Sequence, residues 1–225
     1  MKFTRRGFIR NSFLLGSSLI FHSSSFALPK KEEPWIPTYE KLEREDKFEQ
    51  RVNQAYALFE NCHHCPYERL EILKILDGVI DIYMPDMKYM DPDQAAKYSA
   101  GASDYPELTK KAILEMNRQV GVFQTDKQGI ALRGVIIRHL VMPNRVAGTE
   151  KFAKWVAQVL PKSTSVNIMP QYRVEYKAYE HPEIARGITV QEFLEAMEWA
   201  EKNGLTNLDP NSVAVRNFYK HRRSE

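Results

Sequence analysis

The chain has 225 residues, of which 43% are hydrophobic and 27% are charged. A chain of this size buries one ordinary core, so we expect one folded domain. The formal net charge of +3 is misleading, because the first 27 residues hold four basic residues and no acidic residue. Without them, 28 of the 32 basic residues remain against 29 acidic residues, which gives a net charge of −1. This near-neutral body excludes the electrostatic footprint of a nucleic-acid-binding protein, so we expect no nucleic-acid partner.

Residues 1–27 have the pattern of an export signal. The sequence Thr4-Arg-Arg-Gly-Phe-Ile-Arg10 is followed by a moderately apolar stretch and by a small-x-small sequence at residues 25–27. It resembles a twin-arginine signal, which implies export to the periplasm. The apolar stretch is far shorter than the roughly 20 residues of a membrane-spanning helix, so we expect no stable membrane span after cleavage. An uncleaved anchor or a chance pair of arginines is the alternative.

Residues 28–66 predict a linker followed by a helical extension. Residues 28–37 contain three Pro, two Lys and two Glu, which is typical of an extended linker. Residues 39–61 have apolar residues at helical spacing in a strongly charged frame. These apolar residues are Leu42, Phe48, Val52, Ala55, Tyr56 and Phe59. The helix is expected to stop at Pro66, which closes the sequence Cys62-His-His-Cys-Pro66.

Cys62 and Cys65 are the two cysteines of the chain. As metal ligands they would form half of a zinc or auxiliary-cluster site, with the other ligands supplied from elsewhere. A thioredoxin-like redox pair requires a helix N-terminus, whereas this motif follows a helix. A local disulfide or two free thiols is the third interpretation, and it suits an exported protein.

Three short apolar runs, each ending in Pro and polar residues, predict buried parallel strands near residues 79–84, 135–141 and 165–169. Helices are predicted around them at residues 68–76, 91–98, 105–120, 150–160 and 189–203. Strands that alternate with helices indicate βαβ units and therefore an α/β fold with a parallel sheet. Three strands cannot close a barrel, so we expect an exposed edge or a bare sheet face. Residues 209–225 are expected to be a tail, and its basic end at residues 220–223 is expected to be solvated rather than a binding arm.

The same runs carry a family resemblance. It rests on Gly78-Val-Ile-Asp-Ile-Tyr-Met-Pro-Asp-Met-Lys88, Arg138-His-Leu-Val-Met-Pro143 and Val166-Asn-Ile-Met-Pro-Gln-Tyr172. These segments resemble the last strands of radical S-adenosylmethionine (SAM) proteins related to pyruvate formate-lyase-activating enzyme. The resemblance covers residues 67–208 and implies the C-terminal half of a (β/α) radical-SAM-type barrel. In intact relatives, a [4Fe–4S] cluster and SAM perform the chemistry.

The resemblance implies that residues at the first two strand ends bind the cofactor. Met84 and Asp86 would ligate a cation or orient SAM, and Lys88 would contact a carboxylate. Arg138 would lie near the SAM ribose. From the residues alone, Asp86 and Lys88 could equally be an ion-paired strand end, and Arg138-His139 a charged interruption of a strand.

At the third strand end, the resemblance implies that Gln171 and Tyr172 lie near the adenine. The activating enzymes usually have His at the position of Tyr172, so the chain departs from the family pattern at this residue.

The chain departs from the family at the cluster. Relatives carry Cys-x-x-x-Cys-x-x-Cys, whose three thiolates each hold one iron. This chain has two cysteines, and Pro66 of the extension is joined directly to Tyr67 of the barrel half. We therefore expect no cluster or SAM to be bound stably by the chain alone, and whether it is an enzyme stays open. A protein partner that completes the barrel is one expectation. The alternatives are a non-enzymatic α/β module that binds a partner or ligand, and a periplasmic thiol–disulfide protein.

Overall fold

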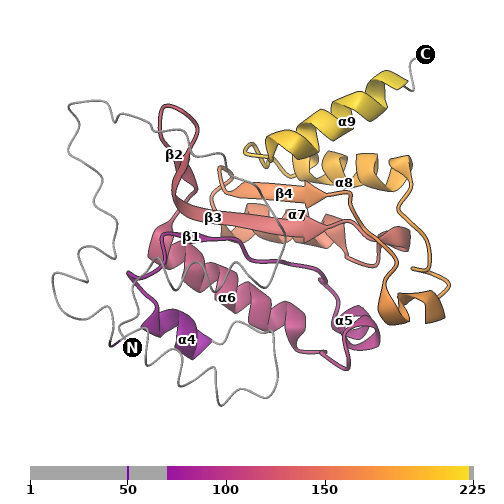
Figure 1. Cartoon of the computed structure of the whole chain (residues 1–225), viewed down its shortest axis with the longest axis horizontal. Coiled ribbons are helices and arrows are strands. Elements are labelled where there is room, and N and C mark those ends of the chain that lie inside the picture. The colour runs from indigo at the N-terminus through magenta and orange to yellow at the C-terminus, as the bar shows by residue number, and fades with distance from the viewer. Residues whose placement is uncertain (1–49, 51–69, 223–225) are drawn as a thin grey trace, which may run out of the picture.

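The computed structural model describes residue 50 and residues 70–222 (Figure 1). The predicted signal, the linker and the pair Cys62 and Cys65 lie outside the described residues. The described elements, in chain order, are α4 (Leu70–Ile75), β1 (Ile82–Tyr83), α5 (Pro92–Tyr98), α6 (Tyr105–Val120), β2 (Gln124–Thr125), β3 (Ala131–Leu140), the 3₁₀ helix η2 (Pro143–Arg145), α7 (Thr149–Val159), β4 (Ser165–Met169), the 3₁₀ helix η3 (Tyr176–Glu180), α8 (Val190–Lys202) and α9 (Pro210–Arg222).

The sheet is built around β3. Both β1 and β4 pair parallel with β3, and the short β2 pairs antiparallel with its beginning. An isolated bridge between Asp86 and Arg138 continues the pairing of β1 and β3 beyond Tyr83. The sheet is not closed. The predicted α/β fold with three parallel strands and an unclosed sheet is therefore confirmed.

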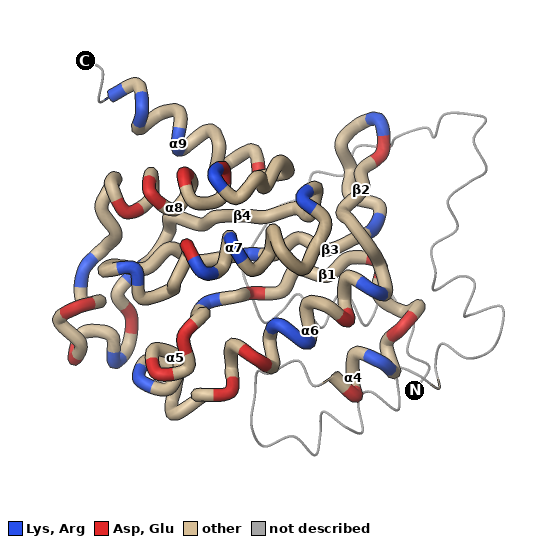
Figure 2. Tube along the Cα trace, turned by 180° about the vertical axis from the view of Figure 1, so that it is seen from behind, with Lys and Arg blue, Asp and Glu red and all other residues tan. Residues whose placement is uncertain are grey.

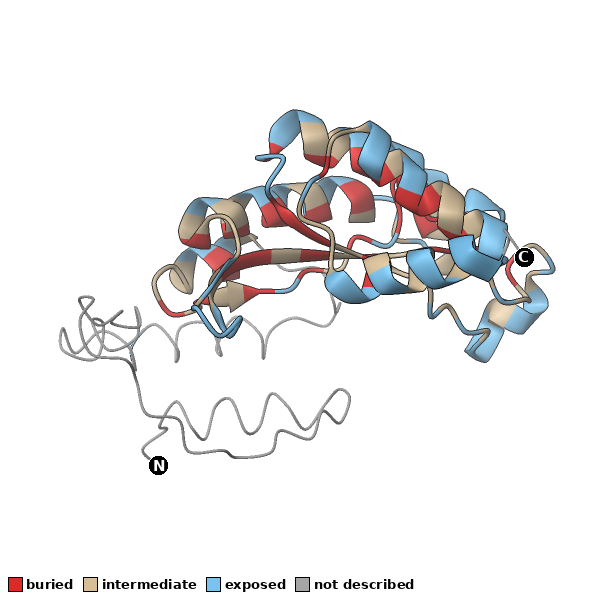
Figure 3. Cartoon of the chain, turned by 90° about the horizontal axis from the view of Figure 1, so that it is seen from above, coloured by how far each residue is buried: buried red, intermediate tan, exposed pale blue. Residues whose placement is uncertain are grey.

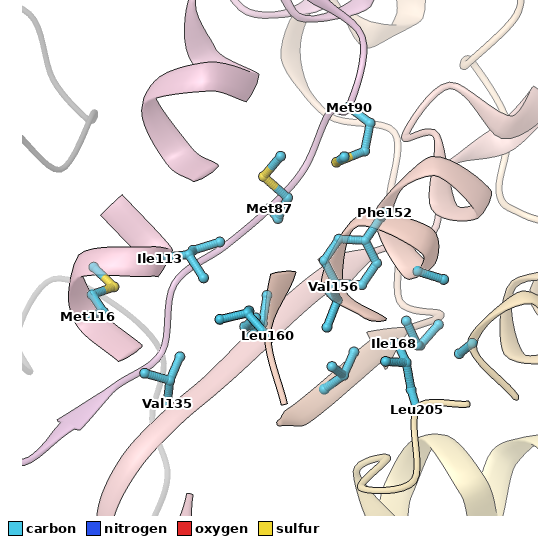
Figure 4. Packing of buried hydrophobic residues seen from close by; sticks show 14 of the residues in the cluster. Met87, Met90, Ile113, Met116, Val135, Phe152, Val156, Leu160, Ile168 and Leu205 are labelled. Carbon is cyan, nitrogen blue, oxygen red and sulfur yellow. The ribbon is translucent and has the colours of Figure 1, made fainter. Parts of the chain in front are cut away.

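One face of the sheet forms the core. On β3, the odd-numbered residues Val135, Ile137 and His139 are buried, and they alternate with half-buried even-numbered residues. Helices α4, α6, α7 and α8 supply apolar side chains to the same cluster as this face. Figure 4 shows such residues of the strands and helices meeting, among them Val135 and Phe152. Buried residues line the strands and the inner sides of the helices (Figure 3). The regular alternation follows from the two-residue repeat of a strand.

The helices begin and end close to the predicted residues, because their caps are encoded locally. The hydroxyl of Thr189 accepts a hydrogen bond from the backbone N–H of Glu192, and the Glu192 side chain accepts one from the backbone N–H of Thr189. This reciprocal pair confirms the predicted capping box of α8. Asp91 caps α5 in a related way, since its side chain accepts from two backbone N–H groups of the first turn.

The strand boundaries differ from the prediction. β1 comprises two residues, whereas residues 79–84 were expected, and β3 begins at Ala131, four residues before the expected start at 135. The earlier start of β3 has a local cause. The Asp126 side chain accepts hydrogen bonds from the backbone N–H groups of Gln128 and Ile130, and this tight turn lets β2 pair with β3.

The expectation of a tail at residues 209–225 is wrong for residues 210–222, which form α9, although residues 220–222 at its basic end are exposed as expected. The Asp209 side chain accepts a hydrogen bond from the backbone N–H of Asn211 at the start of the helix. Val213, Val215 and Tyr219 pack against the main core, and α9 contacts α8 and β4. The basic residues 220–223 suggested a solvated end, so the apolar side of the helix was not recognised in the sequence. Within the part of the chain that the structure describes, no helix is long and apolar enough to span a membrane.

Candidate functional site

The second face of the sheet, which we call the open face, carries the predicted site. Parallel register places side chains of β1, β3 and β4 side by side on it. Its residues are Ile82, Met84, Asp86, Ile136, Arg138, Leu140, Ser165, Asn167 and Met169. Ser165 is buried, the other eight are half-buried or exposed, and Met84 is 55% exposed. The open face therefore has room for further contacts around Met84, whereas Leu140 already packs against a second apolar cluster.

An ion pair marks the carboxyl ends of β1 and β3. Asp86 Oδ1 lies 2.7 Å from Arg138 Nε, and the two side chains are 30% and 39% exposed. Both of these atoms are themselves buried, so each contacts the other rather than solvent. Lys88 Nζ lies 3.7 Å from Asp86 Oδ2, so one carboxylate lies between two cations. The three side chains are partly exposed, and their charges suit a polar ligand with both signs of charge.

Backbone contacts hold the pair in place. The N–H of Met87 donates to the carbonyl of Arg138 (2.8 Å), and the N–H of Arg138 donates to the carbonyl of Pro85 (2.9 Å). The hydroxyl of Tyr105 donates to the carbonyl of Asp86 and accepts from the N–H of Lys88. The first residue of α6 thus fixes the strand end that carries two predicted site residues.

Charges elsewhere lie mainly on helices and loops, with both signs represented (Figure 2). On the parallel strands the pattern differs. β4 has no charged residue, and β3 has Arg133 and Arg138. Arg133 donates to backbone carbonyls at the end of α6, whereas Arg138 reaches Asp86.

Gln171 and Tyr172 lie beyond the end of β4. Gln171 is exposed. The hydroxyl of Tyr172 donates to the carbonyl of Ile184 (3.0 Å), and its ring packs against a second apolar cluster that includes Tyr89 and Met142. Burial raises the pKa of the Tyr172 hydroxyl. The described hydrogen bonds and ion pairs connect neither Gln171 nor Tyr172 to the Asp86–Arg138 pair.

Tyr172 also borders a surface cleft of about 170 Å³ between β4, α8 and α9. It is lined by Pro170, Tyr172, Gly187, Ile188, Thr189, Val190, Phe193 and Tyr219. Tyr172 thus lines this cleft, while its hydroxyl is used inside the fold.

His139 does not belong to the open face, so interpreting Arg138-His139 as a charged interruption is wrong for the second residue. His139 is fully buried and stacks on Phe152, with ring centroids 4.2 Å apart. Its Nδ1 lies 2.6 Å from the carbonyl of Met87, and its Nε2 lies 2.9 Å from the hydroxyl of Thr149. Because a carbonyl only accepts, Nδ1 carries the proton and Nε2 accepts from Thr149. Burial lowers the pKa of His139 to about 4, so the ring is a neutral part of the core.

Two residues of β4 on the open face, Asn167 and Met169, were not predicted from the sequence. Asn167 pairs in register with Arg138, and Met169 pairs with Leu140. The hydroxyl of Ser212 in α9 contacts the side-chain oxygen of Asn167 (3.1 Å). The two-residue repeat of the third run could have found Asn167 and Met169, but only once the register with β3 was known.

The residues present do not fit a [4Fe–4S] cluster. The whole chain has two cysteines, one fewer than a site-differentiated cluster requires. Both lie outside the described residues. Within residue 50 and residues 70–222, no group of three or more His, Cys, Asp or Glu side chains is placed to hold a metal ion.

The fold and the site define an α/β protein with an unclosed parallel sheet and a charged group at its strand ends. No protein-family model matches the chain, and no solved structure matches it. The chain is similar to the uncharacterized protein MJ0674 of Methanocaldococcus jannaschii, with 34% identity over 140 residues. That region is 62% of this chain and 37% of the relative, so the chain spans little more than a third of the relative's length. The similarity carries no activity with it.

Proposed function

We propose that the chain belongs to the radical SAM family related to pyruvate formate-lyase-activating enzyme, with residues 67–208 as the C-terminal half of the barrel. Three parallel strands with helices between them support this proposal, as does the clustering of Met84, Asp86 and Arg138 at the strand ends. In barrels and open α/β sheets, ligands bind at this end of the strands.

The proposed function is binding of SAM, or of the amino-acid part of a similar ligand, at the open face. The observation that carries it is the group of Asp86, Arg138 and Lys88, three charged and partly exposed side chains that meet at the strand ends. Asp86 suits a ligand ammonium or cation, Lys88 suits a carboxylate, and Arg138 suits ribose hydroxyls. Met84 offers an exposed apolar contact beside them.

Without a third thiolate, the chain alone has no means to hold the cluster on which radical chemistry depends. The proposal therefore assigns it no radical activity by itself. An intact enzyme would need the cluster-binding segment from a partner chain. Export through the twin-arginine signal would place both in the periplasm.

Isothermal titration calorimetry of the full chain with SAM tests the binding proposal. Asp86→Asn and Arg138→Ala are each expected to weaken binding about tenfold or more, which corresponds to about 1.4 kcal/mol. Arg118→Ala is the control, because it removes an exposed guanidinium from α6 on the covered side. Equal affinities of all three variants, or no binding by the unmodified chain, would contradict the proposed site.

Anaerobic reconstitution with iron and sulfide tests the second part. We expect no cluster absorbance and no 5′-deoxyadenosine on reduction in the presence of SAM. Formation of both by the chain alone would show that the cysteine argument is wrong.

The second candidate is a non-enzymatic module that binds a protein partner. It is favoured by the position of β1 at one end of the described sheet, whereas the outer edge of β4 is bridged by Leu208. A chain that is monodisperse, monomeric and cooperatively melting would count against a required partner. The thiol–disulfide candidate depends on Cys62 and Cys65. It would be abandoned if Cys62→Ser left any measured reductase activity unchanged.

A further inference from the structure

His139 is an unusual residue for the position that it occupies. It is 0% exposed, on the face of β3 where Val135 and Ile137 are apolar. A buried polar ring lowers stability unless its hydrogen bonds are made, and an apolar ring would fill the same space beside Phe152. The reason for a histidine here therefore lies in the groups that its two nitrogens contact.

The first of these groups is the carbonyl of Met87, which lies between two residues of the candidate site. The Met87 side chain is 0% exposed and belongs to the main core (Figure 4). Because side chains alternate along an extended segment, those of Asp86 and Lys88 leave the backbone toward the open face. Whatever holds the backbone at Met87 therefore also sets where these two charged side chains begin.

The peptide group before Met87 is held from both sides. The carbonyl of Asp86 accepts a hydrogen bond from the hydroxyl of Tyr105 (2.8 Å), and the N–H of Met87 donates to the carbonyl of Arg138 (2.8 Å). The second bond continues the parallel pairing of β1 and β3. The position of this peptide group thus follows from the sheet and from the first residue of α6.

The peptide group after Met87 is held by side chains alone. Its carbonyl accepts from the Nδ1–H of His139 (2.6 Å), so a side chain takes the place that a backbone N–H of β3 has in a regular ladder. Its N–H, which belongs to Lys88, donates to the hydroxyl of Tyr105 (3.0 Å). Because a peptide group is planar, fixing its carbonyl and its N–H also fixes the direction in which the Lys88 side chain leaves the backbone.

The second nitrogen of the ring attaches His139 to α7. Its Nε2 accepts from the hydroxyl of Thr149, the first residue of that helix, which is itself 3% exposed. The ring also stacks on Phe152 of α7. These two contacts leave the ring one tautomer and one orientation, in which the Nδ1–H points at the Met87 carbonyl.

We propose that His139 is a positioning residue of the candidate ligand site, and that it acts by holding the Met87 carbonyl and thereby the backbone from which Asp86 and Lys88 reach the ligand. The ring is buried on the covered face and touches no ligand itself. This inference rests on the proposed ligand binding for its effect on affinity. Its effect on the backbone is measurable without any ligand.

Two amide substitutions in the full chain separate the two hydrogen bonds of the ring. The shorter side chain of Asn places its amide N–H near the position of Nδ1, whereas that of Gln reaches the position of Nε2. His139→Asn is therefore expected to keep the bond to the Met87 carbonyl, and His139→Gln the contact with Thr149. Both variants lose the ring that stacks on Phe152, so they are a matched pair in lost packing.

Amide hydrogen exchange at Lys88, followed by NMR, gives the readout without ligand. It is expressed relative to the exchange of the Ile137 amide, which reports opening of the core. The ratio is expected to rise about tenfold in His139→Gln and to stay within about twofold of the unmodified value in His139→Asn. If His139→Gln does not fold, His139→Phe, which keeps a ring but has no donor, should show the same rise. An unchanged ratio in a folded variant without the Met87 bond would overturn the proposal.

Titration calorimetry of the same variants with SAM gives the second readout. His139→Gln is expected to weaken binding about tenfold, as is usual when a group that orients a ligand-binding residue is lost, and His139→Asn is expected to restore most of the affinity. Equal affinities of both variants and the unmodified chain would overturn the positioning role. If the unmodified chain does not bind SAM, the proposed function fails, and the exchange ratio at Lys88 alone decides whether His139 fixes this strand end.

Discussion

The two faces of the sheet are made of similar residues but have different surroundings. On β3, Ile137 is 0% exposed beneath the helices, whereas its neighbour Ile136 is half-buried on the open face. The same contrast separates His139, a neutral ring inside the core, from Arg138, a paired cation with 39% exposure. One strand thus provides both the main packing surface and the candidate site. Neighbouring positions on it should respond very differently to substitution.

The largest expected difference comes from Ile137→Ala and Ile136→Ala. Ile137→Ala leaves a cavity among fully buried side chains, so we expect a loss of about 2–5 kcal/mol in the free energy of unfolding. Ile136→Ala should cost about 1 kcal/mol, because its side chain is only half-buried. Urea denaturation of the two variants measures the comparison. Equal losses would mean that both faces are packed to the same density.

The fold was predictable where the signal is local. The capping box of Thr189 and Glu192, the helix start at Asp91 and the three apolar runs all depend on residues within a few positions of each other. α9 was not predictable in the same way. Its hydrophobic side is short and interrupted. The helix is stabilised by contacts with α8 and β4, which a local sequence pattern cannot predict.

The candidate site was predictable in part for the same reason. Met84, Asp86 and Lys88 alternate along one run, so their common face follows from the strand repeat. The pairing of the strands and their register determine that Arg138 contacts Asp86 and that the His139 side chain lies in the core. Neither can be read from a single run of the sequence. The internal use of the Tyr172 hydroxyl depends on the carbonyl of Ile184, which belongs to a loop without a sequence signature.

The next prediction concerns the pH dependence of stability, to which the buried His139 on the covered face contributes. His139 has a pKa of about 4 in the folded protein, below the usual value of 6.5, because burial disfavours its charged form. Above pH 6.5 the ring is neutral in both states and contributes no pH dependence. As the pH falls from 6.5 toward 4, the unfolded state binds the proton first, so stability should fall by up to about 1.4 kcal/mol per pH unit.

Urea midpoints between pH 7.5 and 5 measure this slope. The lower limit avoids Glu192, whose pKa is lowered to about 2 mainly by its hydrogen bond with Arg186 and whose stabilising contribution is lost only as the pH falls from 4.5 toward 2. His139→Gln is expected to flatten the slope. An unchanged slope in His139→Gln would contradict the assignment of a neutral buried ring.

Tyr172→Phe tests how much the hydroxyl of Tyr172, which lies beyond the end of β4, contributes to the free energy of unfolding. It removes the hydrogen bond to the Ile184 carbonyl and leaves the ring in place, so we expect a loss of about 1 kcal/mol. Tyr179→Phe is the control, since Tyr179 is 69% exposed and should change stability by less than about 0.5 kcal/mol. If Tyr172→Phe also left thermal stability unchanged, the hydroxyl would be free for a ligand, as the family resemblance implies.

The smallest effect on stability is expected at the Asp86–Arg138 pair itself. Both side chains are about a third exposed, and ion pairs in such positions contribute about 0.5–1 kcal/mol. A double-mutant cycle with Asp86→Asn and Arg138→Met, followed by urea denaturation, measures their coupling. A small coupling together with a clear loss of SAM binding in the single variants would mean that the pair is kept for recognition rather than for the fold. A coupling above about 3 kcal/mol is typical of a fully buried pair, and it would assign the open face the same structural role as the covered one.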